Sequence, residues 1–147
     1  TRRHSSAASD VYKRQLSVVL ADFISTQGLK EVVQRYRPSH NLDLKDHLHY
    51  YQIGWGDYYR GGMYGFVSSH AANFFAIATF SISFLIDYKR WLNPLLIFIA
   101  VLVSFSRIYL GVHYFSDVFV GGLVGMAIAL LVYRFVFLTL HKKFVKV

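Results

Sequence analysis

The chain has 147 residues, of which 54% are hydrophobic, 18% aromatic and 16% charged, and its formal net charge is +8 at pH 7. Because soluble domains usually carry about 25% charged residues, this composition indicates a membrane protein. The chain contains no cysteine, which excludes disulfides, thiolate catalysis and cysteine–zinc sites.

Residues 1–15 differ from the rest of the chain. They are polar, follow no hydrophobic period and lack the apolar centre of a signal peptide. The string Ser-Ala-Ala-Ser-Asp-Val-Tyr-Lys-Arg-Gln within them resembles a translated adaptor sequence from metagenomic assemblies. We therefore expect residues 1–15 to be a non-native leader, and residues 16–147 to be a membrane domain that has lost its own N-terminal part.

The first apolar segment covers residues 16–33 and is interrupted by polar residues such as Asp22. A charged side chain on a lipid-facing helix is unfavourable. The pattern therefore predicts a helix packed among other helices, with Asp22 turned inward. Two roles for Asp22 stay open, namely a hydrogen-bonded packing residue and a proton relay.

Residues 35–67 are polar and aromatic without a clean period, which predicts an extramembrane loop. Its aromatic side chains suit the headgroup level of a bilayer; they are Tyr50, Tyr51, Trp55, Tyr58, Tyr59 and Tyr64. The loop also carries His40, His47 and His49, whose spacing fits no helical pair of metal ligands. We therefore expect surface histidines and no bound metal.

Three further apolar runs, at residues 68–86, 93–109 and 114–140, each have about the 20 residues that a helix needs to cross a bilayer. Ser68 suits the N-cap of the first run. Gly121 and Gly125 form a small-xxx-small face for close helix packing in the third. Together with the first apolar segment, these runs predict an all-α integral membrane bundle with about four transmembrane helices.

Basic residues flank the predicted spans at one membrane face, which the positive-inside rule makes cytoplasmic; they are Lys89, Arg90, Lys142, Lys143 and Lys146. A second polar group lies at the opposite, external ends of the spans; its members are Lys30, Arg37, His70, Arg107 and His113. This division argues against a nucleic-acid partner, which would need a single basic stripe. It favours an anion site at the external face.

Two clusters contribute to that site from the first half of the chain. Lys30 and Arg37 are close to two helical turns apart, so we expect them on one helix face, and Pro38 then ends the helix. Ser69 and His70 stand at a predicted helix start, where free backbone N–H groups favour an anion.

The third cluster is the stretch Ser-Arg-Ile-Tyr-Leu-Gly-Val-His-Tyr-Phe-Ser-Asp at residues 106–117. The planar guanidinium of Arg107 suits a phosphate, and Gly111 lets the chain turn. His113 and Asp117 are four residues apart, so on a helix they share a face and can touch. A carboxylate bound to one imidazole nitrogen leaves the other nitrogen as a base or a nucleophile. The alternative is a helix-end ion pair without catalytic role.

In their order and spacing, these clusters resemble the signature of the type 2 phosphatidic acid phosphatase superfamily, which shares its site with vanadium haloperoxidases. The signature reads K-x6-R-P, then P-S-G-H, then S-R-x5-H-x3-D. The first and third parts match in full, whereas Val67 and Ser69 replace the proline and the glycine of the second. Integral members of the family usually have six spans, so the resemblance implies that two of them are missing from this chain.

The resemblance implies a phosphate-binding group made of three cations, Lys30, Arg37 and Arg107, whose charges stabilise the transition state. Ser68 and the backbone N–H groups near Ser69 would hold further phosphate oxygens. These fixed cations would supply what Mg²⁺ supplies in other phosphoryl-transfer enzymes. We therefore expect neither a metal nor another cofactor.

The resemblance also implies the catalytic roles. His113 would attack phosphorus and form a phosphohistidine, and Asp117 would orient His113. His70 would act as general acid toward the leaving oxygen, and afterwards as base toward water.

The implied activity is hydrolysis of a lipid phosphate or diphosphate at the outer face of a bacterial inner membrane. An isoprenoid diphosphate such as undecaprenyl diphosphate is the first expectation. Phosphatidic acid, phosphatidylglycerol phosphate and lipid A phosphates are alternatives. Two other interpretations use the same residues: vanadate-dependent halide oxidation, and a non-catalytic membrane scaffold or lipid-binding protein with a relic site. The oligomeric state has no sequence signal.

Overall fold

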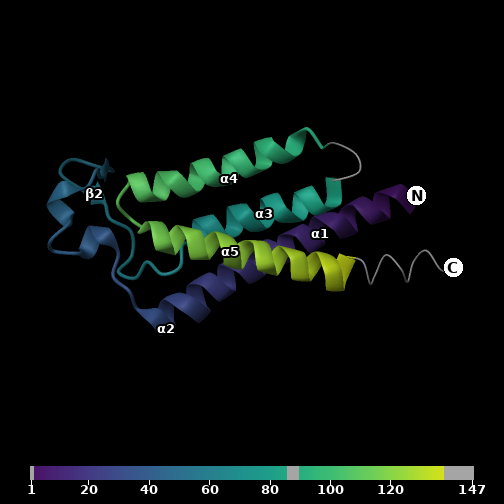
Figure 1. Cartoon of the computed structure of the whole chain (residues 1–147), viewed down its shortest axis with the longest axis horizontal. Coiled ribbons are helices and arrows are strands. Elements are labelled where there is room, and N and C mark those ends of the chain that lie inside the picture. Colours follow the sequence, from purple (N-terminus) through teal and green to yellow (C-terminus); the bar gives the residue numbers. More distant parts are fainter. Residues whose placement is uncertain (1, 86–89, 138–147) are drawn as a thin grey trace.

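The computed structural model describes residues 2–85 and 90–137. Its long helices run side by side in alternating directions, and the loops that join α2 to α3 and α4 to α5 gather at one end of the bundle (Figure 1). The long helices are α1 (Arg2–Phe23), α3 (Ser69–Leu85), α4 (Leu92–Tyr109) and α5 (Phe115–Val132). The predicted helical class is therefore confirmed.

The first helix is longer than predicted. It begins at Arg2, inside the segment that we expected to be a non-native leader, and the origin of that segment stays a prediction. Beyond α1 the chain continues through a π-helical stretch, η1 (Ile24–Lys30), and one further turn, α2 (Glu31–Val33). The helix α5 continues in a similar way into η4 (Tyr133–Phe137).

Asp22 does not face inward, so that part of the prediction is wrong. Its neighbour Ala21 is the buried residue of this turn, and Asp22 itself is exposed. The Asp22 Oδ1 atom accepts a hydrogen bond of 3.1 Å from Nδ2 of Asn73 on α3. This contact ties α1 to α3, which supports the packing role for Asp22.

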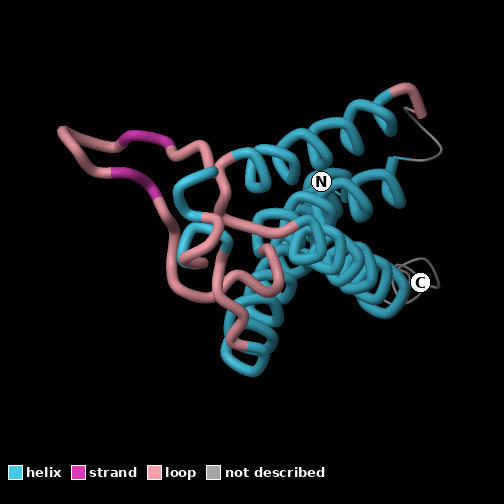
Figure 2. Tube along the Cα trace, turned by 60° about the vertical axis from the view of Figure 1, so that its left-hand side comes forward, coloured by secondary structure: helices cyan, strands magenta, loops and turns pink. Residues whose placement is uncertain are grey.

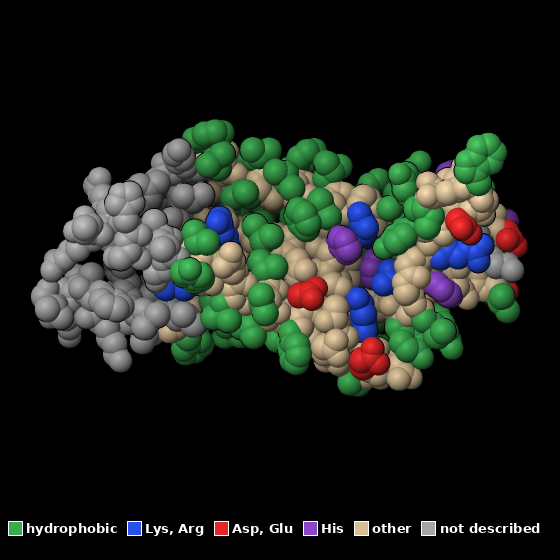
Figure 3. All heavy atoms as spheres, turned by 180° about the vertical axis from the view of Figure 1, so that it is seen from behind, with side chains coloured by type: hydrophobic (Ala, Val, Ile, Leu, Met, Phe, Trp, Pro, Cys, Tyr) green, Lys and Arg blue, Asp and Glu red, His purple; other side chains and the backbone are tan. Residues whose placement is uncertain are grey.

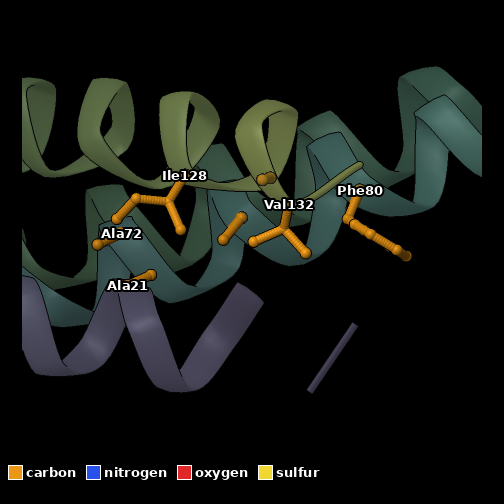
Figure 4. Packing of buried hydrophobic residues seen from close by; sticks show 7 residues of the cluster. Ala21, Ala72, Phe80, Ile128 and Val132 are labelled. Atoms are coloured by element: carbon orange, nitrogen blue, oxygen red, sulfur yellow. The ribbon is translucent and has the colours of Figure 1, made fainter. Parts of the chain in front are cut away.

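The hydrophobic core lies between α1, α3 and α5 and consists mainly of small side chains (Figure 4). Its buried members are Ala21, Ala72, Ala76, Phe80, Ile128, Ala129 and Val132. The helix α4 packs mainly on α3 and leaves large apolar side chains exposed, Phe98 and Phe105 among them. Such a surface suits contact with lipid.

Glycines bring α3 and α5 into close contact, as predicted from their spacing. A Cβ atom on Gly121 would lie 2.6 Å from the carbonyl oxygen of Ser68. A Cβ atom on Gly125 would clash with the carbonyl oxygen of Ala72, one turn deeper in α3. Small residues at such an interface let two membrane helices approach closely.

Within residues 2–85 and 90–137, two helices are long and apolar enough to cross a membrane, Leu92–Tyr109 and Phe115–Phe135. They correspond to the last two of the predicted spans. The total of about four spans stays a prediction. Four of the basic residues that set the predicted orientation lie outside the described residues; they are Lys89, Lys142, Lys143 and Lys146.

The loop between α2 and α3 contains short regular elements that the sequence pattern did not predict. It has two 3₁₀ turns, η2 (Pro38–His40) and η3 (Lys45–His47). A small antiparallel hairpin follows, formed by β1 (Tyr51–Gln52) and β2 (Tyr58–Tyr59). This hairpin projects from the end of the bundle (Figure 2), and Trp55 at its tip is fully exposed.

Candidate active site

The path of the chain after the first helix corrects one prediction. Gln34 has a left-handed backbone (φ 48°) and ends the helix. Residues 35–37 then run extended beside residues 63–65, joined by backbone hydrogen bonds. A residue before proline favours an extended backbone, which suits Arg37. Lys30 and Arg37 therefore do not share a helix face, and Arg37 reaches the site from an extended segment.

Arg37 is held by the loops on both sides of the site and is 9% exposed. Its Nε donates a hydrogen bond to the carbonyl oxygen of Tyr64 over 3.1 Å. Its Nη1 donates to the carbonyl oxygen of Val112 over 3.2 Å and also lies 3.2 Å from Nε2 of His113. Because a guanidinium is always a donor, Nε2 is the acceptor in this contact. The free electron pair of Nε2 thus points toward the Arg37 guanidinium.

His113 lies in the turn before α5 rather than on the helix. Gly111 (φ 64°) makes the turn out of α4, as predicted, and Tyr114 is the N-cap of α5. Asp117 Oδ2 accepts a hydrogen bond of 2.9 Å from the Tyr114 N–H and lies 3.7 Å from His113 Nδ1. The two side chains therefore meet, as predicted, but through a capping turn and not along one helix face.

Burial controls the charge of His113, which is 3% exposed beside a fully buried Asp117. Removal from water disfavours the imidazolium and lowers the pKa of His113 below its usual 6.5, while the Asp117 carboxylate opposes this shift. The nearby cations Arg37 and Lys30 lower the pKa further. The ring is therefore neutral near pH 7, which is the form with a nucleophilic nitrogen.

The start of α3 forms the neighbouring wall of the site. The Ser68 hydroxyl accepts a bond of 3.5 Å from the Ala71 N–H, as predicted for an N-cap. The Ser68 N–H donates to the carbonyl oxygen of Asp117 over 2.9 Å, which joins the starts of α3 and α5. The next residue, Ser69, accepts a hydrogen bond of 2.7 Å from Nζ of Lys30. The end of η1 thus supplies a cation to the start of α3.

His70 and Arg107 complete the group. His70 lies in the first turn of α3 and is exposed, and Arg107 lies half-buried in the last turn of α4. The charges of Arg107, Lys30 and Arg37 all act on the His70 ring. His113 is also near enough to act on it. The two imidazoles therefore share one electrostatic environment that is rich in positive charge.

The predicted convergence is confirmed as a matter of position. Five residues that are far apart along the chain lie at the same end of the bundle; they are Lys30, Arg37, His70, Arg107 and His113. In Figure 3, Lys, Arg and His side chains gather on the surface near the loops, while hydrophobic side chains cover the flanks of the helices. Such a group of cations suits an anion with several oxygens.

One charged member of the site, Arg35, was not predicted from the sequence. Its Nη1 donates to Oδ1 of Asp117 over 3.0 Å and to Oγ of Ser116 over 2.7 Å. The signal was present in the string Arg-Tyr-Arg-Pro. The proline predicts an extended backbone before it, and residues two apart in an extended segment face the same side, so Arg35 should accompany Arg37.

The three loop histidines show no sign of acting together. Within the described ranges, no group of three or more His, Cys, Asp or Glu side chains could hold a metal ion. His49 instead stacks on Tyr109 at the end of α4, with ring centroids 5.6 Å apart. His40 lies within 3.2 Å of the Ser39 hydroxyl.

The fold and the site together define a helical protein that has, among its described residues, two helices apolar enough to cross a membrane and a buried histidine between a guanidinium and a carboxylate, with further cations around it. The family model of the PAP2 superfamily matches residues 13–140 of this chain. The chain therefore belongs to the PAP2 superfamily.

Relatives in two functional groups resemble the chain. It is 38% identical over 119 residues to the lipid A 4′-phosphatase of Porphyromonas gingivalis, a match that covers 81% of this chain and 48% of that protein. It is 40% identical over 68 residues to the undecaprenyl-diphosphatase of Sulfolobus acidocaldarius, which covers 46% of this chain and 32% of that protein. The chain thus spans about half the length, or less, of these relatives.

A solved structure also shares the fold. It is the transmembrane PAP2-type phosphatidylglycerolphosphate phosphatase from Bacillus subtilis, with a TM-score of 0.55 and 26% sequence identity. The likeness covers 83% of this chain and 56% of that one. Together with the two apolar helices, it identifies the chain as part of a membrane protein.

Proposed function

We propose that the protein is a lipid phosphatase that transfers a phosphoryl group from a membrane lipid to His113 and then to water. The observation that carries this function is the contact of 3.2 Å between Arg37 Nη1 and His113 Nε2 beside the buried Asp117. A phosphate oxygen that takes the guanidinium N–H would lie next to the nitrogen that attacks. The proposed nucleophile, His113, and a proposed phosphate-binding residue, Arg37, are thus already in contact.

The first chemical step forms one bond and breaks another. His113 Nε2 attacks phosphorus, the bond from phosphorus to the lipid oxygen breaks, and His70 donates a proton to that oxygen. Lys30, Arg37 and Arg107 hold the remaining phosphate oxygens and offset the charge that develops on them. The backbone near Ser68 and Ser69 would bind a further oxygen. The products of this step are a phosphohistidine and the lipid with one phosphoryl group fewer, which for a diphosphate is the lipid monophosphate.

The second step returns the enzyme to its starting state. Water attacks the phosphorus of the phosphohistidine while His70 accepts one of its protons, and the bond from phosphorus to Nε2 breaks. Asp117 holds the His113 ring in place through both steps, with Nδ1 toward the carboxylate. Inorganic phosphate then leaves, and no metal is required because the cations belong to the protein.

The substrate is a phosphate or diphosphate on a lipid. A lipid A phosphate is the first candidate, because the lipid A 4′-phosphatase match covers most of this chain. An isoprenoid diphosphate, the first expectation from the sequence, is favoured by the shorter undecaprenyl-diphosphatase match. Phosphatidylglycerol phosphate is suggested by the name of the structural neighbour, and phosphatidic acid is a further candidate.

The proposed location is the inner membrane of a bacterium, with the protein crossing it several times and the site facing the periplasm or the exterior. Arg90 and Arg134 support this orientation, since they lie at the opposite end of α4 and α5 from the site. The positive-inside rule makes that end cytoplasmic.

The test measures phosphate release by the full-length protein in lipid nanodiscs from lipid A, undecaprenyl diphosphate, phosphatidylglycerol phosphate and phosphatidic acid. We expect release from at least one of them, with or without EDTA, and none from His113→Ala. A rapidly formed, acid-labile ³²P label on the wild-type chain that is absent from His113→Ala identifies the phosphohistidine intermediate. Loss of activity with EDTA would contradict the metal-free mechanism. If no phosphate is released from any of these lipids, a scaffold with a relic site is the better description.

A further inference from the structure

We propose that Arg35 is a positioning residue that holds Asp117, and through it His113, in the orientation for attack on phosphorus. This role rests on the proposed phosphatase function. It adds a member to the site that none of the three signature clusters contains as a defined residue, since Arg35 falls among the six variable positions between Lys30 and Arg37.

The extended backbone aims Arg35 and Arg37 at the same target. The Gly65 N–H donates to the Arg35 carbonyl oxygen over 2.8 Å, and Tyr36 forms a bridge with Tyr64. Because side chains alternate along an extended segment, Tyr36 points away from the two arginines. Arg37 then contacts His113, and Arg35 contacts the carboxylate behind it.

Arg35 contacts three residues at the start of α5, namely the N-cap Tyr114 and the helix residues Ser116 and Asp117. Its guanidinium lies 4.1 Å from the ring centroid of Tyr114. One nitrogen, Nη1, donates to Ser116 Oγ over 2.7 Å and to Asp117 Oδ1 over 3.0 Å. The side chain of Arg35 is 39% exposed, whereas that of Asp117 is 0% exposed. The partly exposed Arg35 thus reaches into the buried site and binds Asp117. Among the described residues, Asp117 is the only carboxylate that faces His113.

The two oxygens of Asp117 have separate partners. Oδ1 is held by Arg35, while Oδ2 accepts from the Tyr114 N–H and faces His113 Nδ1. Loss of Arg35 would leave Oδ1 buried without this donor, and the carboxylate would then rotate toward another donor. This rotation alters the group that faces Nδ1, so the attacking ring loses its fixed orientation.

The positive charge of Arg35 should also affect the protonation of His113, in addition to its effect on the orientation of the ring. The charges of Arg37, Lys30 and Asp117 act on His113, His70 lies near it, and Arg35 balances the charge of Asp117. Without the Arg35 cation, the carboxylate attracts a proton onto His113 more strongly. The imidazole should therefore become easier to protonate, which a purely structural tie between two loops would not cause.

The experiment follows His113 directly in ¹⁵N-histidine-labelled full-length protein by NMR titration. In Arg35→Ala we expect the pKa of His113 to rise by about half a unit to one unit, and kcat to fall about tenfold with little change in KM. Arg35→Lys keeps the charge without the planar fork, so its titration should stay near wild type while kcat recovers only in part. Arg60→Ala, which removes another exposed loop arginine that stacks on Tyr50, should change neither quantity.

A double variant decides whether Arg35 acts through Asp117. In an Asp117→Asn background, Arg35→Ala should add no further loss of kcat and no further shift of the His113 titration. An unchanged titration in Arg35→Ala, or a loss of kcat that is equally large with and without the carboxylate, would overturn the assignment. If Arg35→Ala does not fold, Arg35→Lys and Arg35→Gln give the same comparison. The titration needs no turnover, so it still decides the role of Arg35 if the wild-type protein releases no phosphate.

Discussion

The Nζ atom of Lys30 donates a hydrogen bond of 2.7 Å to the hydroxyl of Ser69, the residue that stands where the family signature has glycine. Ser69 has no left-handed backbone, so its N–H remains in ordinary helical geometry at the start of α3. The replacement of glycine therefore adds a partner for Lys30 without straining the backbone. In the absence of substrate, the Ser69 hydroxyl holds the Lys30 ammonium group. A substrate phosphate would have to displace this hydroxyl in order to bind Lys30.

Removal of this hydroxyl should strengthen substrate binding. In Ser69→Ala, Lys30 loses its competing acceptor, so we expect KM to fall about two- to fivefold, the size of one hydrogen bond, with kcat nearly unchanged. Steady-state phosphate release by nanodisc-embedded protein measures both constants. Ser69→Gly restores the family residue and should behave alike, apart from a small loss of stability from a glycine in a helix. A higher KM in both variants would mean that the hydroxyl itself binds phosphate.

Asp117→Asn should slow catalysis without unfolding the protein. Asparagine keeps one oxygen to accept from the Tyr114 N–H, so the start of α5 stays capped, but its neutral amide no longer steadies His113. We expect kcat to fall about 100-fold or more, as in other sites where a carboxylate orients a catalytic histidine. Circular dichroism and thermal unfolding in the same detergent check the fold, and a wild-type rate in a folded variant would remove Asp117 from the mechanism.

The pH dependence follows from the direction of the His113 shift. Because burial lowers the pKa of His113 below 6.5, the neutral nucleophile persists into mildly acidic solution, and the acid limb of kcat/KM should lie below pH 6.5. The same residue binds a proton more readily in the unfolded chain. Its contribution to stability is therefore complete above about pH 6.5 and is lost as the pH falls toward the folded pKa.

The carboxylate provides the matched control for this pH profile. Since Asp117 raises the pKa of His113, Asp117→Asn should move the acid limb to still lower pH, whereas Arg35→Ala should move it to higher pH. Both profiles come from kcat/KM measured between about pH 4 and 8 in the same lipid. Shifts in the same direction in the two variants would be inconsistent with opposite charges acting on His113.

Gly125 should tolerate no side chain. A Cβ atom there would clash with the Ala72 carbonyl oxygen, so Gly125→Ala must push α5 away from α3. We expect a loss of about 1–3 kcal/mol in the free energy of unfolding, typical of overpacking, measured by denaturation in mixed micelles. Gly54→Ala in the hairpin meets no atom within 4 Å and serves as the control, with a change under about 0.5 kcal/mol. Equal stability of the two variants would contradict the close helix contact.

The two tryptophans should report both interfaces of the bilayer. Trp91 precedes α4, and Trp55 lies on the hairpin beyond the other end of that helix. In Trp91→Phe and Trp55→Phe each remaining indole is observed alone, because the chain has two tryptophans. We expect quenching by lipids brominated near the headgroup in both variants, and weak quenching by deeply brominated chains. An indole that responds to acrylamide and to no brominated lipid lies in water.

The helices could be predicted closely because their signals are local. The run 68–86 corresponds to α3, and the run 93–109 to α4, with starts and ends within a residue or two. Ser68 as N-cap and Gly111 as a turn residue were correct for the same reason, since each depends on a few neighbouring backbone groups. The glycine face of α5 could also be predicted, because Gly121 and Gly125 are four residues apart in the sequence.

The remainder depends on contacts between distant segments. Nothing local marks Gln34 as left-handed, since the pairing of residues 35–37 with residues 63–65 determines where the helix ends. The hairpin at Trp55 and the outward position of Asp22 likewise depend on what packs nearby. The cations of the site still met as predicted, but by another route than the expected helix face. Their catalytic roles are the subject of the proposed experiments.

The seam of glycines between α3 and α5 has a consequence for the reaction. His70 and His113 lie at the adjacent starts of these two helices, and the Ser68–Asp117 backbone bond joins the helices just there. Gly121 and Gly125 lie deeper along α5 and set how closely the helix axes approach. In the proposed mechanism, the spacing between the proton donor His70 and the nucleophile His113 therefore depends on how closely these two helices pack, so that a change in lipid thickness or a molecule wedged between the helices would change the rate without touching the residues proposed to bind phosphate.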